Sequence, residues 1–377
     1  MLDQEEIMSR ILEWSETGKI RPYMLEIRPT DRCNLRCPYC VLRGHRFADT
    51  SEKELTPEEF EQVIDDAAEL GVRYVQIVGG GEPLLREDAV LRIMRKAKKY
   101  GMRGSLITNG TLLTDNFIGE VVRLRWDTIH FSFDAPIPEI NDFLRSRAGC
   151  YEKAASAISR LARAKLERQC DLPRLVLLPV LNHYNCGLMA DMVRVGAALG
   201  VQGVIFQPVY TLEKPASRQF ALDEGDMATV REQIPLAETI AEQLGLFTNG
   251  GQLSASALSL SSPHCAPTEA GAELTAASGE MDYHGHPVLS IPCYAPFFYI
   301  GVHADGSVGA CSTDSIYTSK GNVREQRLTD ICSGNLFGRF WMDLAQNVRP
   351  PFCGKCCRTT IMEMRRIRGL LAKRMEA

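Results

Sequence analysis

Hydrophobic and polar positions follow two alternating patterns along the chain. Short apolar runs typical of buried strands recur between amphipathic segments of helical length, from about residue 23 to residue 207. The predicted strands are 24–27, 74–78, 104–108, 128–133, 174–180 and 203–206. Strands that alternate with helices in this way are typical of a parallel sheet connected by crossover helices. The pattern therefore predicts an α/β fold with six β/α units.

Local signals mark where the helices begin and end. Thr56 and Glu59 have the spacing of a capping box at a helix start. Pro57 suits the first helical position, and Gly71 suits the end of the same helix. These signals support a helix between the first two predicted strands.

The pattern divides the chain into four parts. Residues 1–20 are predicted to form an amphipathic helix, 21–209 hold the six β/α units, and 291–377 form a cysteine-rich tail. Between them, 210–290 loses its periodicity except for one helix predicted at 223–244. We therefore expect an insertion, a linker or a lid at 210–290.

Composition excludes several classes of function. The 377 residues are 45% hydrophobic and 24% charged, with a formal net charge of −4, as in an ordinary globular chain. There is no basic run suited to a phosphate backbone, so nucleic acid is not an expected partner. No stretch has the apolar length of a membrane span or the centre of a signal peptide, so we expect a cytoplasmic protein and no membrane partner. In that compartment the 13 cysteines suit metal ligation better than disulfides.

Three cysteines lie in one loop after the first predicted strand. Cys33, Cys37 and Cys40 have the spacing C-x3-C-x2-C, which can hold three irons of a [4Fe–4S] cluster and leaves the fourth iron open. A zinc knuckle or a redox pair of Cys37 and Cys40 is the alternative. Because the carboxyl ends of parallel strands meet at one mouth, residues that end the later strands should surround this loop. They are Gly80-Gly81-Glu82, Thr108-Asn109-Gly110 and Ser132-Phe133-Asp134.

The cysteine loop, with Tyr39 before its third cysteine, and the segment Gly80-Gly81-Glu82 resemble the radical SAM superfamily. The resemblance implies a partial (β/α)6 barrel in which the open iron binds S-adenosylmethionine and the reduced cluster cleaves it to a 5′-deoxyadenosyl radical. Tyr39, Gly80, Gly81 and Glu82 would then belong to the cofactor site, with a carboxylate or carbonyl of this segment accepting hydrogen bonds from the ammonium group. A flavodoxin or ferredoxin-type protein is implied as the reductant.

The same resemblance implies further cofactor contacts. Ser132 or Asp134 would contact the ribose, and Arg145 would pair with the methionyl carboxylate. The backbone near Val180 or Phe206 would pack on the adenine, with Asn109 at the same mouth. Each has an ordinary alternative: Asn109 in a turn, Ser132 and Asp134 as helix caps, and Arg145 as a surface charge. Their joint placement at strand ends favours the functional interpretation.

The tail contains a second group of cysteines. They are Cys293, Cys311, Cys353 and Cys356, with Cys357 as an alternative ligand. A hairpin with Asp305-Gly306 at its tip would return Cys311 toward Cys293. Four converging thiolates would leave no open coordination position, as in an electron-transfer cluster or a zinc ribbon. The tail resembles the SPASM/twitch domains of radical SAM enzymes, which implies a small α+β domain. Since no cysteine follows Cys357, we expect the twitch form with one auxiliary [4Fe–4S] cluster.

These resemblances imply a radical SAM oxidoreductase. We expect it to oxidise a small polar substrate, such as an aminosugar, a cyclitol or a natural-product intermediate, with the auxiliary cluster as electron acceptor. An epimerase is an alternative, in which Cys332 or Cys265 would be the catalytic hydrogen donor. Peptide or protein maturation is a third hypothesis. It is less favoured because only residues 1–22 precede the first predicted strand. An iron–sulfur electron carrier is the non-enzymatic alternative, but it would not need the strand-end residues.

Overall fold

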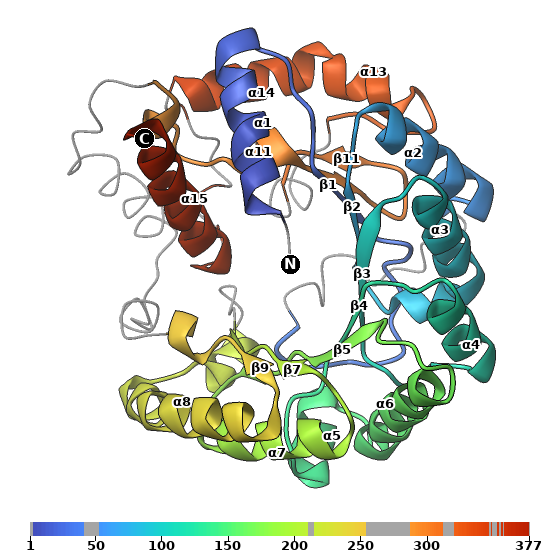
Figure 1. The fold of residues 1–377 in the computed structure, drawn as a ribbon, viewed down its shortest axis with the longest axis vertical. Helices are drawn as coiled ribbons and strands as arrows, with labels where there is room; N and C mark the ends of the chain where they lie inside the picture. The colour runs from blue at the N-terminus through green and yellow to red at the C-terminus, as the bar shows by residue number, and fades with distance from the viewer. Residues whose placement is uncertain are drawn as a thin grey trace.

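A curved sheet lines the inside of the molecule and helices cover its outer face (Figure 1). Its strand order is β11-β10-β1-β2-β3-β4-β5-β7-β9, and every neighbouring pair is parallel except β10 with β11. This computed structural model describes residues 3–40, 53–209, 215–253, 287–311, 320–346 and 358–376, with 348, 353 and 356.

The six predicted strands are confirmed and form the centre of the sheet. They are β1 (Met24–Ile27), β2 (Tyr74–Ile77), β3 (Arg103–Thr108), β4 (Thr128–Phe131), β5 (Arg174–Leu177) and β7 (Gly203–Val204). One row of paired positions is apolar and fully buried: Ile27, Ile77, Leu106, Ile129 and Leu175. An adjacent row is polar: Glu26, Gln76, Ser105 and Thr128. Because successive side chains point to opposite faces, the apolar row packs under the helices and the polar row faces the interior of the barrel.

Helices connect the strands in the expected order. Those of the barrel and the segment after it are α2 (Pro57–Glu69), α3 (Glu87–Lys99), α4 (Asp115–Arg123), α5 (Pro138–Arg145), α6 (Cys150–Glu167), α7 (Met189–Ala198) and α8 (Glu224–Leu244). The predicted capping box is confirmed, since the Glu59 amide donates to Thr56 Oγ1 over 3.2 Å and the Thr56 amide donates to Glu59 Oε2 over 2.6 Å. Gly71 follows α2 with φ of +80°, where a side chain would be strained.

The tail adds strands to the sheet of the barrel. Strand β10 (Tyr299–Val302) pairs in parallel with β1 along all four positions, and β11 (Val308–Gly309) returns beside it. The hairpin predicted at Asp305-Gly306 is confirmed, with Gly306 at φ of +84°. At the other edge, β9 (Phe247–Thr248) pairs with β7. Part of the predicted insertion and part of the tail therefore complete the barrel sheet, although the sequence predicted neither β9 nor the pairing of β10 with β1.

The ends of the chain pack together beside this sheet (Figure 1). The N-terminal helix is confirmed as α1 (Gln4–Thr17). The tail helices are α11 (Ala295–Phe298), α13 (Leu328–Ser333), α14 (Asn335–Ala345) and α15 (Arg358–Glu376). Helix α1 contacts both α11 and α15. In the described ranges, no helix combines the length and the apolar content needed to cross a membrane.

Candidate functional site

The cysteine loop follows β1 and lies against the end of β2. Amides of Gly81 and Glu82 donate to the carbonyl oxygens of Thr30 and Arg32 over 2.9 and 2.8 Å. A Cβ added at Gly81 would lie 1.8 Å from the Arg32 oxygen, and one at Gly80 would lie 1.9 Å from Asp31 Oδ1. The two glycines are thus needed because the loop itself approaches β2 so closely.

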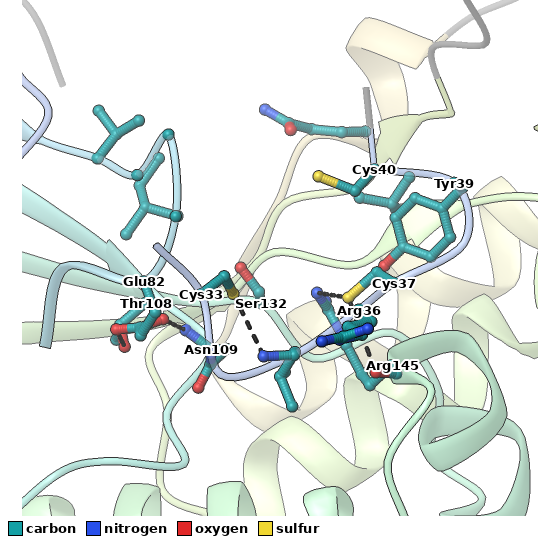
Figure 2. A pocket seen from close by; sticks show the side chains of 18 of the residues that line it. Cys33, Arg36, Cys37, Tyr39, Cys40, Glu82, Thr108, Asn109, Ser132 and Arg145 are labelled. Carbon is teal, nitrogen blue, oxygen red and sulfur yellow. Dashed lines mark hydrogen bonds between the residues drawn. The ribbon is translucent and has the colours of Figure 1, made fainter. Parts of the chain in front are cut away.

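A cavity of about 350 Å³ opens between this loop and the strand ends (Figure 2). It is lined by all three loop cysteines and by most of the residues predicted for the cofactor: Tyr39, Gly80, Gly81, Glu82, Asn109, Ser132, Arg145 and Val180. Thr108, expected at this mouth as the end of a strand, lines it too. Arg36, Gln207 and Pro208 also line it and were missed by the sequence analysis. Gln207 and Pro208 belong to the two-residue strand β8, which pairs with β6 (Val180–Leu181).

Glu82 connects the ends of β2 and β3. Its carboxylate is buried and accepts hydrogen bonds from Thr108 Oγ1 over 2.6 Å, from the Asn109 amide over 2.8 Å and from the Leu84 amide over 3.1 Å. Burial raises the pKa of Glu82, although these hydrogen bonds oppose the shift. Asn109 in turn donates to Asn34 Oδ1 over 2.9 Å. Glu82 therefore fixes the wall of the cavity and holds Asn109 toward the cysteine loop.

Asp134 lies behind the cavity wall and organises three lining residues. Its carboxylate accepts hydrogen bonds from the Tyr39 hydroxyl and from the Val180 amide, the latter over 3.0 Å. Arg145 Nη2 lies 2.9 Å from its Oδ1. Burial raises the pKa of Tyr39 well above its ordinary value, so the phenol keeps its proton. Neither Ser132 nor Asp134 caps α5, whose N-cap is Ile137, so the capping alternative is wrong.

Arg145 offers the clearest fit to an anionic ligand. It ends α5, is 6% exposed and donates from Nη1 to Cys37 Sγ over 3.8 Å, so it is not a surface charge. Its Nε and Nη2 have no hydrogen-bond acceptor among the described residues, because the Asp134 ion pair is poorly aligned. Burial lowers its pKa, but Asp134, Tyr39 and Cys37 together outweigh burial and hold the pKa well above the ordinary value. A buried cation with unsatisfied donors at a cavity suits a carboxylate ligand.

The loop thiols are free and partly buried. Burial raises the pKa of Cys33 to about 11, and burial also raises the pKa of Cys37 although Arg145 opposes it. The Leu35 amide donates to Cys33 Sγ over 3.4 Å. Such thiols lose their protons when they bind a metal centre, whose charge replaces the proton. The three thiols at the rim of a cavity therefore fit a cluster with one open iron.

The tail cysteines come from separate segments. Cys293 lies between η6 (Pro287–Ser290) and α11, Cys311 follows β11, and Cys353 and Cys356 precede α15. Cys293, Cys311 and Cys353 pack against the main hydrophobic core. The Cys356 amide donates to the Cys353 carbonyl over 3.1 Å, as expected for a tight loop. Cys357 and Cys265 lie outside the described residues.

Arg368 fixes α15 beside Cys293. Its guanidinium is buried and donates from Nη2 to the carbonyl oxygens of Ile291 and Pro292 over 2.7 and 3.3 Å. The Tyr294 amide also lies 3.1 Å from Met364 Sδ on the same helix. The position of Cys293 thus depends on a helix that follows it by more than sixty residues in the chain.

Cys332, predicted as a hydrogen donor for an epimerase, does not line the cavity. It lies on α13, which packs against α2 in the outer layer of helices. Its side chain is buried, and burial raises its pKa to about 12. The position is that of a core cysteine.

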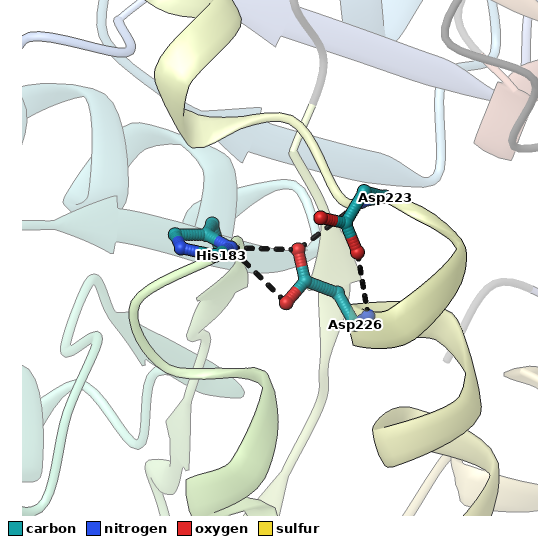
Figure 3. A group of neighbouring side chains, drawn as sticks. All are labelled: His183, Asp223 and Asp226. Atoms are coloured by element: carbon teal, nitrogen blue, oxygen red, sulfur yellow. Dashed lines mark hydrogen bonds and ion pairs between the residues drawn. The ribbon is translucent and has the colours of Figure 1, made fainter.

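His183, Asp223 and Asp226 form a cluster that sequence reasoning missed (Figure 3). His183 Nδ1 lies 2.9 Å from Asp226 Oδ2, while the two aspartates cap the start of α8 through each other's amides. The three could hold a cation by distance, but their oxygens already serve the helix cap and the ion pair. The spacing of the two aspartates is a capping-box signal, and only the fold brings His183 to them.

Comparisons with known proteins agree with this geometry. Residues 27–185 match the family model of the radical SAM superfamily, and residues 293–357 match the SPASM iron–sulfur cluster-binding domain. A probable GTP 3′,8-cyclase of Thermococcus kodakarensis is 32% identical over 179 residues, which are 47% of this chain and 53% of the relative. The PqqA peptide cyclase of Bradyrhizobium diazoefficiens is 33% identical over 176 residues, 47% of this chain and 43% of the relative. The chain thus matches about half the length of these two relatives.

Solved structures show the same fold over most of the chain. Streptococcus suis SuiB superposes with a TM-score of 0.64 at 15% identity, covering 89% of this chain and 71% of SuiB. The native anSMEcpe with bound AdoMet and the Kp18Cys peptide gives a TM-score of 0.58 at 16% identity, covering 87% of this chain and 84% of the other. At these identities the likeness concerns the fold. The two family matches show that this chain contains a radical SAM domain, with its iron–sulfur cluster and S-adenosylmethionine, followed by a SPASM domain with an auxiliary iron–sulfur cluster.

Proposed function

We propose that this enzyme oxidises a side chain of a peptide or protein substrate. The observation that carries the proposal is the cavity, whose lining consists largely of residues suited to the cofactor. Its volume of about 350 Å³ is at the low end for a site that encloses one small ligand. With the cofactor bound there, the substrate reaches the reactive position from the open mouth. A side chain presented on a larger molecule suits that approach.

The named relatives support a peptide substrate in part. PqqA peptide cyclase is similar over 47% of this chain, and the solved structures include SuiB bound to its precursor peptide SuiA. The aminosugar or cyclitol substrate expected from the sequence has no such support. A small-molecule substrate is the second candidate, because the probable GTP 3′,8-cyclases are similar over a comparable share of the chain.

The residues of the cavity have distinct roles in this proposal. Cys33, Cys37 and Cys40 hold the first cluster, which, when bound and reduced, supplies a 5′-deoxyadenosyl radical from S-adenosylmethionine. Arg145 binds the carboxylate of that cofactor through its unsatisfied Nε and Nη2. Asp134 positions Arg145 and the Val180 backbone, and Asp134 also keeps the Tyr39 ring against the loop.

Asn109 and Ser132 supply polar atoms on the wall formed by β3 and β4, where the ribose is expected. The substrate would lose one hydrogen atom and one proton, and the auxiliary cluster, held by the tail cysteines, would supply the acceptor for the remaining electron. The product is therefore two hydrogens poorer than the substrate. We keep the single-cluster, twitch-like form of the tail, with Cys293, Cys311, Cys353 and Cys356 as ligands, as part of this proposal.

An epimerase reaction is less well supported than a dehydrogenase reaction. The described candidate donor, Cys332, lies in the outer helix layer and not at the cavity. An epimerase would return a hydrogen atom from a thiol that exchanges with solvent. The two reactions therefore leave different isotopic signatures.

The test uses anaerobically reconstituted protein with S-adenosylmethionine, a reductant, and two substrate pools, one of synthetic peptides and one of nucleotides and aminosugars. We expect 5′-deoxyadenosine formation to be stimulated by a peptide, with a product lighter by two hydrogens in mass spectrometry. In deuterium oxide, a product that carries solvent deuterium and has not lost two hydrogens would identify an epimerase. Stimulation by a nucleotide alone would identify a small-molecule substrate, the second candidate.

A separate variant tests the role of Arg145. Arg145→Lys keeps the charge but removes the planar fork, so we expect S-adenosylmethionine to bind about tenfold more weakly, with iron content unchanged. Isothermal titration measures the affinity. An unchanged affinity would remove Arg145 from the cofactor site.

A further inference from the structure

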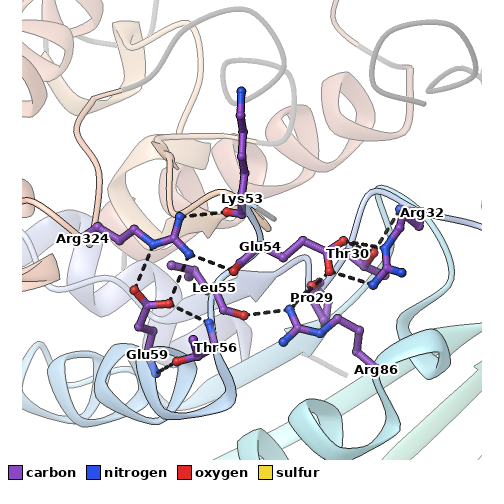
Figure 4. Close-up of polar contacts among 10 residues, drawn as sticks. All are labelled: Pro29, Thr30, Arg32, Lys53, Glu54, Leu55, Thr56, Glu59, Arg86 and Arg324. Carbon is purple, nitrogen blue, oxygen red and sulfur yellow. Dashed lines mark hydrogen bonds and ion pairs between the residues drawn. The ribbon is translucent and has the colours of Figure 1, made fainter. Parts of the chain in front are cut away.

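The cysteine loop is connected to the SPASM domain by a continuous polar network (Figure 4). Thr30 and Arg32 lie three residues and one residue before Cys33, and their carbonyl oxygens are fixed by the amides at the end of β2. The Arg32 amide also donates to Thr30 Oγ1 over 3.0 Å. The conformation of Thr30 and Arg32 therefore sets where the loop begins and how Cys33 faces the cavity.

Glu54 holds both of these residues. Its side chain is 3% exposed, accepts a hydrogen bond from the Thr30 hydroxyl, and accepts from Arg32 Nε and Nη2 over 3.1 and 2.9 Å. Arg86 Nη1 lies 3.5 Å from the same carboxylate and donates to the carbonyl oxygen of Pro29 over 3.2 Å. A buried carboxylate with these partners is costly to displace, because each loss would leave a charge unpaired.

Arg324 holds the backbone that carries Glu54. It lies between β11 and α13, in the segment matched by the SPASM domain. Its Nη2 donates to the Glu54 carbonyl over 2.8 Å, its Nη1 to the Lys53 carbonyl over 2.9 Å, and its Nε to Glu59 Oε1 over 2.9 Å. Hence one guanidinium of the tail fixes the backbone whose carboxylate fixes the cysteine loop.

We propose that Arg324 and Glu54 are positioning residues through which the SPASM domain fixes the geometry of the Cys33 loop. The planar guanidinium suits this role, because it satisfies two carbonyl oxygens and one carboxylate in different directions at once. The auxiliary domain then serves the first cluster mechanically, in addition to any transfer of electrons. The inference rests on the domain assignment and does not depend on the proposed substrate.

Arg327 provides a matched control. It belongs to the same segment and also connects the tail to α2, donating from Nη2 to Asp66 Oδ1 over 2.8 Å and to Glu69 Oε2 over 2.7 Å. Its side chain is 50% exposed and that of Arg324 is 35% exposed, so truncation of either leaves the core intact. Arg327 does not bond to Glu54 or to the cysteine loop in the described contacts.

The first test compares hydrogen–deuterium exchange in full-length Arg324→Ala and Arg327→Ala proteins prepared without iron. We expect amides of residues 30–40 to exchange about tenfold faster in Arg324→Ala than in Arg327→Ala, the effect of losing a charged hydrogen-bond partner. Because no cluster or substrate is present, this result is independent of the proposed function. Equal exchange of residues 30–40 in the two variants would overturn the inference.

The second test uses the reconstituted holoenzyme and the electron paramagnetic resonance spectrum of the reduced first cluster. We expect Arg324→Ala and Glu54→Gln to alter this spectrum and its response to S-adenosylmethionine, whereas Arg327→Ala matches the unmodified enzyme. Arg324→Lys should restore the spectrum only in part, since one ammonium cannot reach all three acceptors in this geometry. An unaltered spectrum in both Arg324→Ala and Glu54→Gln would show that the network is merely structural and would overturn the proposed role.

Discussion

The two cysteine-bearing regions of this enzyme are built in different ways. The first places three thiols on one loop, which backbone hydrogen bonds to the end of β2 and the carboxylate of Glu54 hold in place. The second draws its thiols from segments on either side of the hairpin and before α15, and long-range contacts such as that of Arg368 hold them. A site contained in one loop can be recognised from spacing. A site assembled from separate segments depends on the packing of the whole tail.

The largest expected effect comes from removing the ligands of one region at a time. Replacing Cys33, Cys37 and Cys40 together with Ala should abolish cleavage of S-adenosylmethionine and remove about four irons per chain. Replacing Cys293 and Cys311 with Ala should remove a similar amount of iron but preserve reductive cleavage of the cofactor. Iron analysis and chromatography of 5′-deoxyadenosine measure both outcomes. Cofactor cleavage by the loop variant would contradict the assignment of the first cluster.

A smaller effect is expected from crowding the cysteine loop. Gly81→Ala would place a Cβ 1.8 Å from the Arg32 oxygen, so the loop must move away from β2. We expect a loss of about 2–4 kcal/mol of unfolding free energy and poor incorporation of the first cluster. Chemical denaturation and iron content measure these effects.

Gly338→Ala is the control for this substitution. Gly338 lies in α14, and a Cβ added there would meet nothing within 4 Å. Alanine in a helix interior should leave stability equal or raise it by about 0.5–1 kcal/mol. If Gly81→Ala behaved in the same way, the close contact between the loop and β2 would not exist in solution.

Arg368 tests the long-range character of the second region. Arg368→Met keeps the length and apolar stem of the side chain but leaves the Ile291 and Pro292 carbonyl oxygens without this donor. We expect a loss of about 1–3 kcal/mol and a selective loss of the auxiliary iron. Calorimetry and iron analysis test this. Equal loss of iron from both regions would show that Arg368 does not act selectively on the second region.

The smallest expected effect comes from the ion pair of His183 and Asp226, which contributes to the stability of the fold and belongs to neither cysteine-bearing region. The hydrogen bond that protonated His183 donates to Asp226 raises the pKa of His183, so the charged pair stabilises the fold fully below the ordinary histidine pKa and this contribution is lost as pH rises through the folded pKa. The His183 side chain is 51% exposed, so solvent screening limits the contribution to a few tenths of a kcal/mol, about 0.2–0.5. His183→Gln should lower the melting temperature at about pH 5.5 more than at about pH 9. An equal shift at both values would contradict the ion pair.

The sequence predicted the barrel strands and the first site because both are encoded by residues that lie close together in the chain. Strand runs such as 74–78 and the spacing of Cys33, Cys37 and Cys40 need no knowledge of distant contacts. The role of Asp134 behind the cavity wall could not be read from the sequence, because its partners Tyr39, Val180 and Arg145 come from three other elements. Glu54 gave no signal either, since it lies outside any regular pattern and gains its role from Thr30, Arg32 and Arg324.

The parallel pairing of β10 with β1 has a consequence for biosynthesis. Strand β1 leaves the ribosome before its partner β10, which is separated from it by more than 270 residues. Contacts of such sequence separation form slowly, and an unpaired strand edge can template association with another chain. During translation the nascent barrel therefore carries an open edge until the SPASM region is made. Chaperone dependence and aggregation of stalled chains should be greatest in that interval.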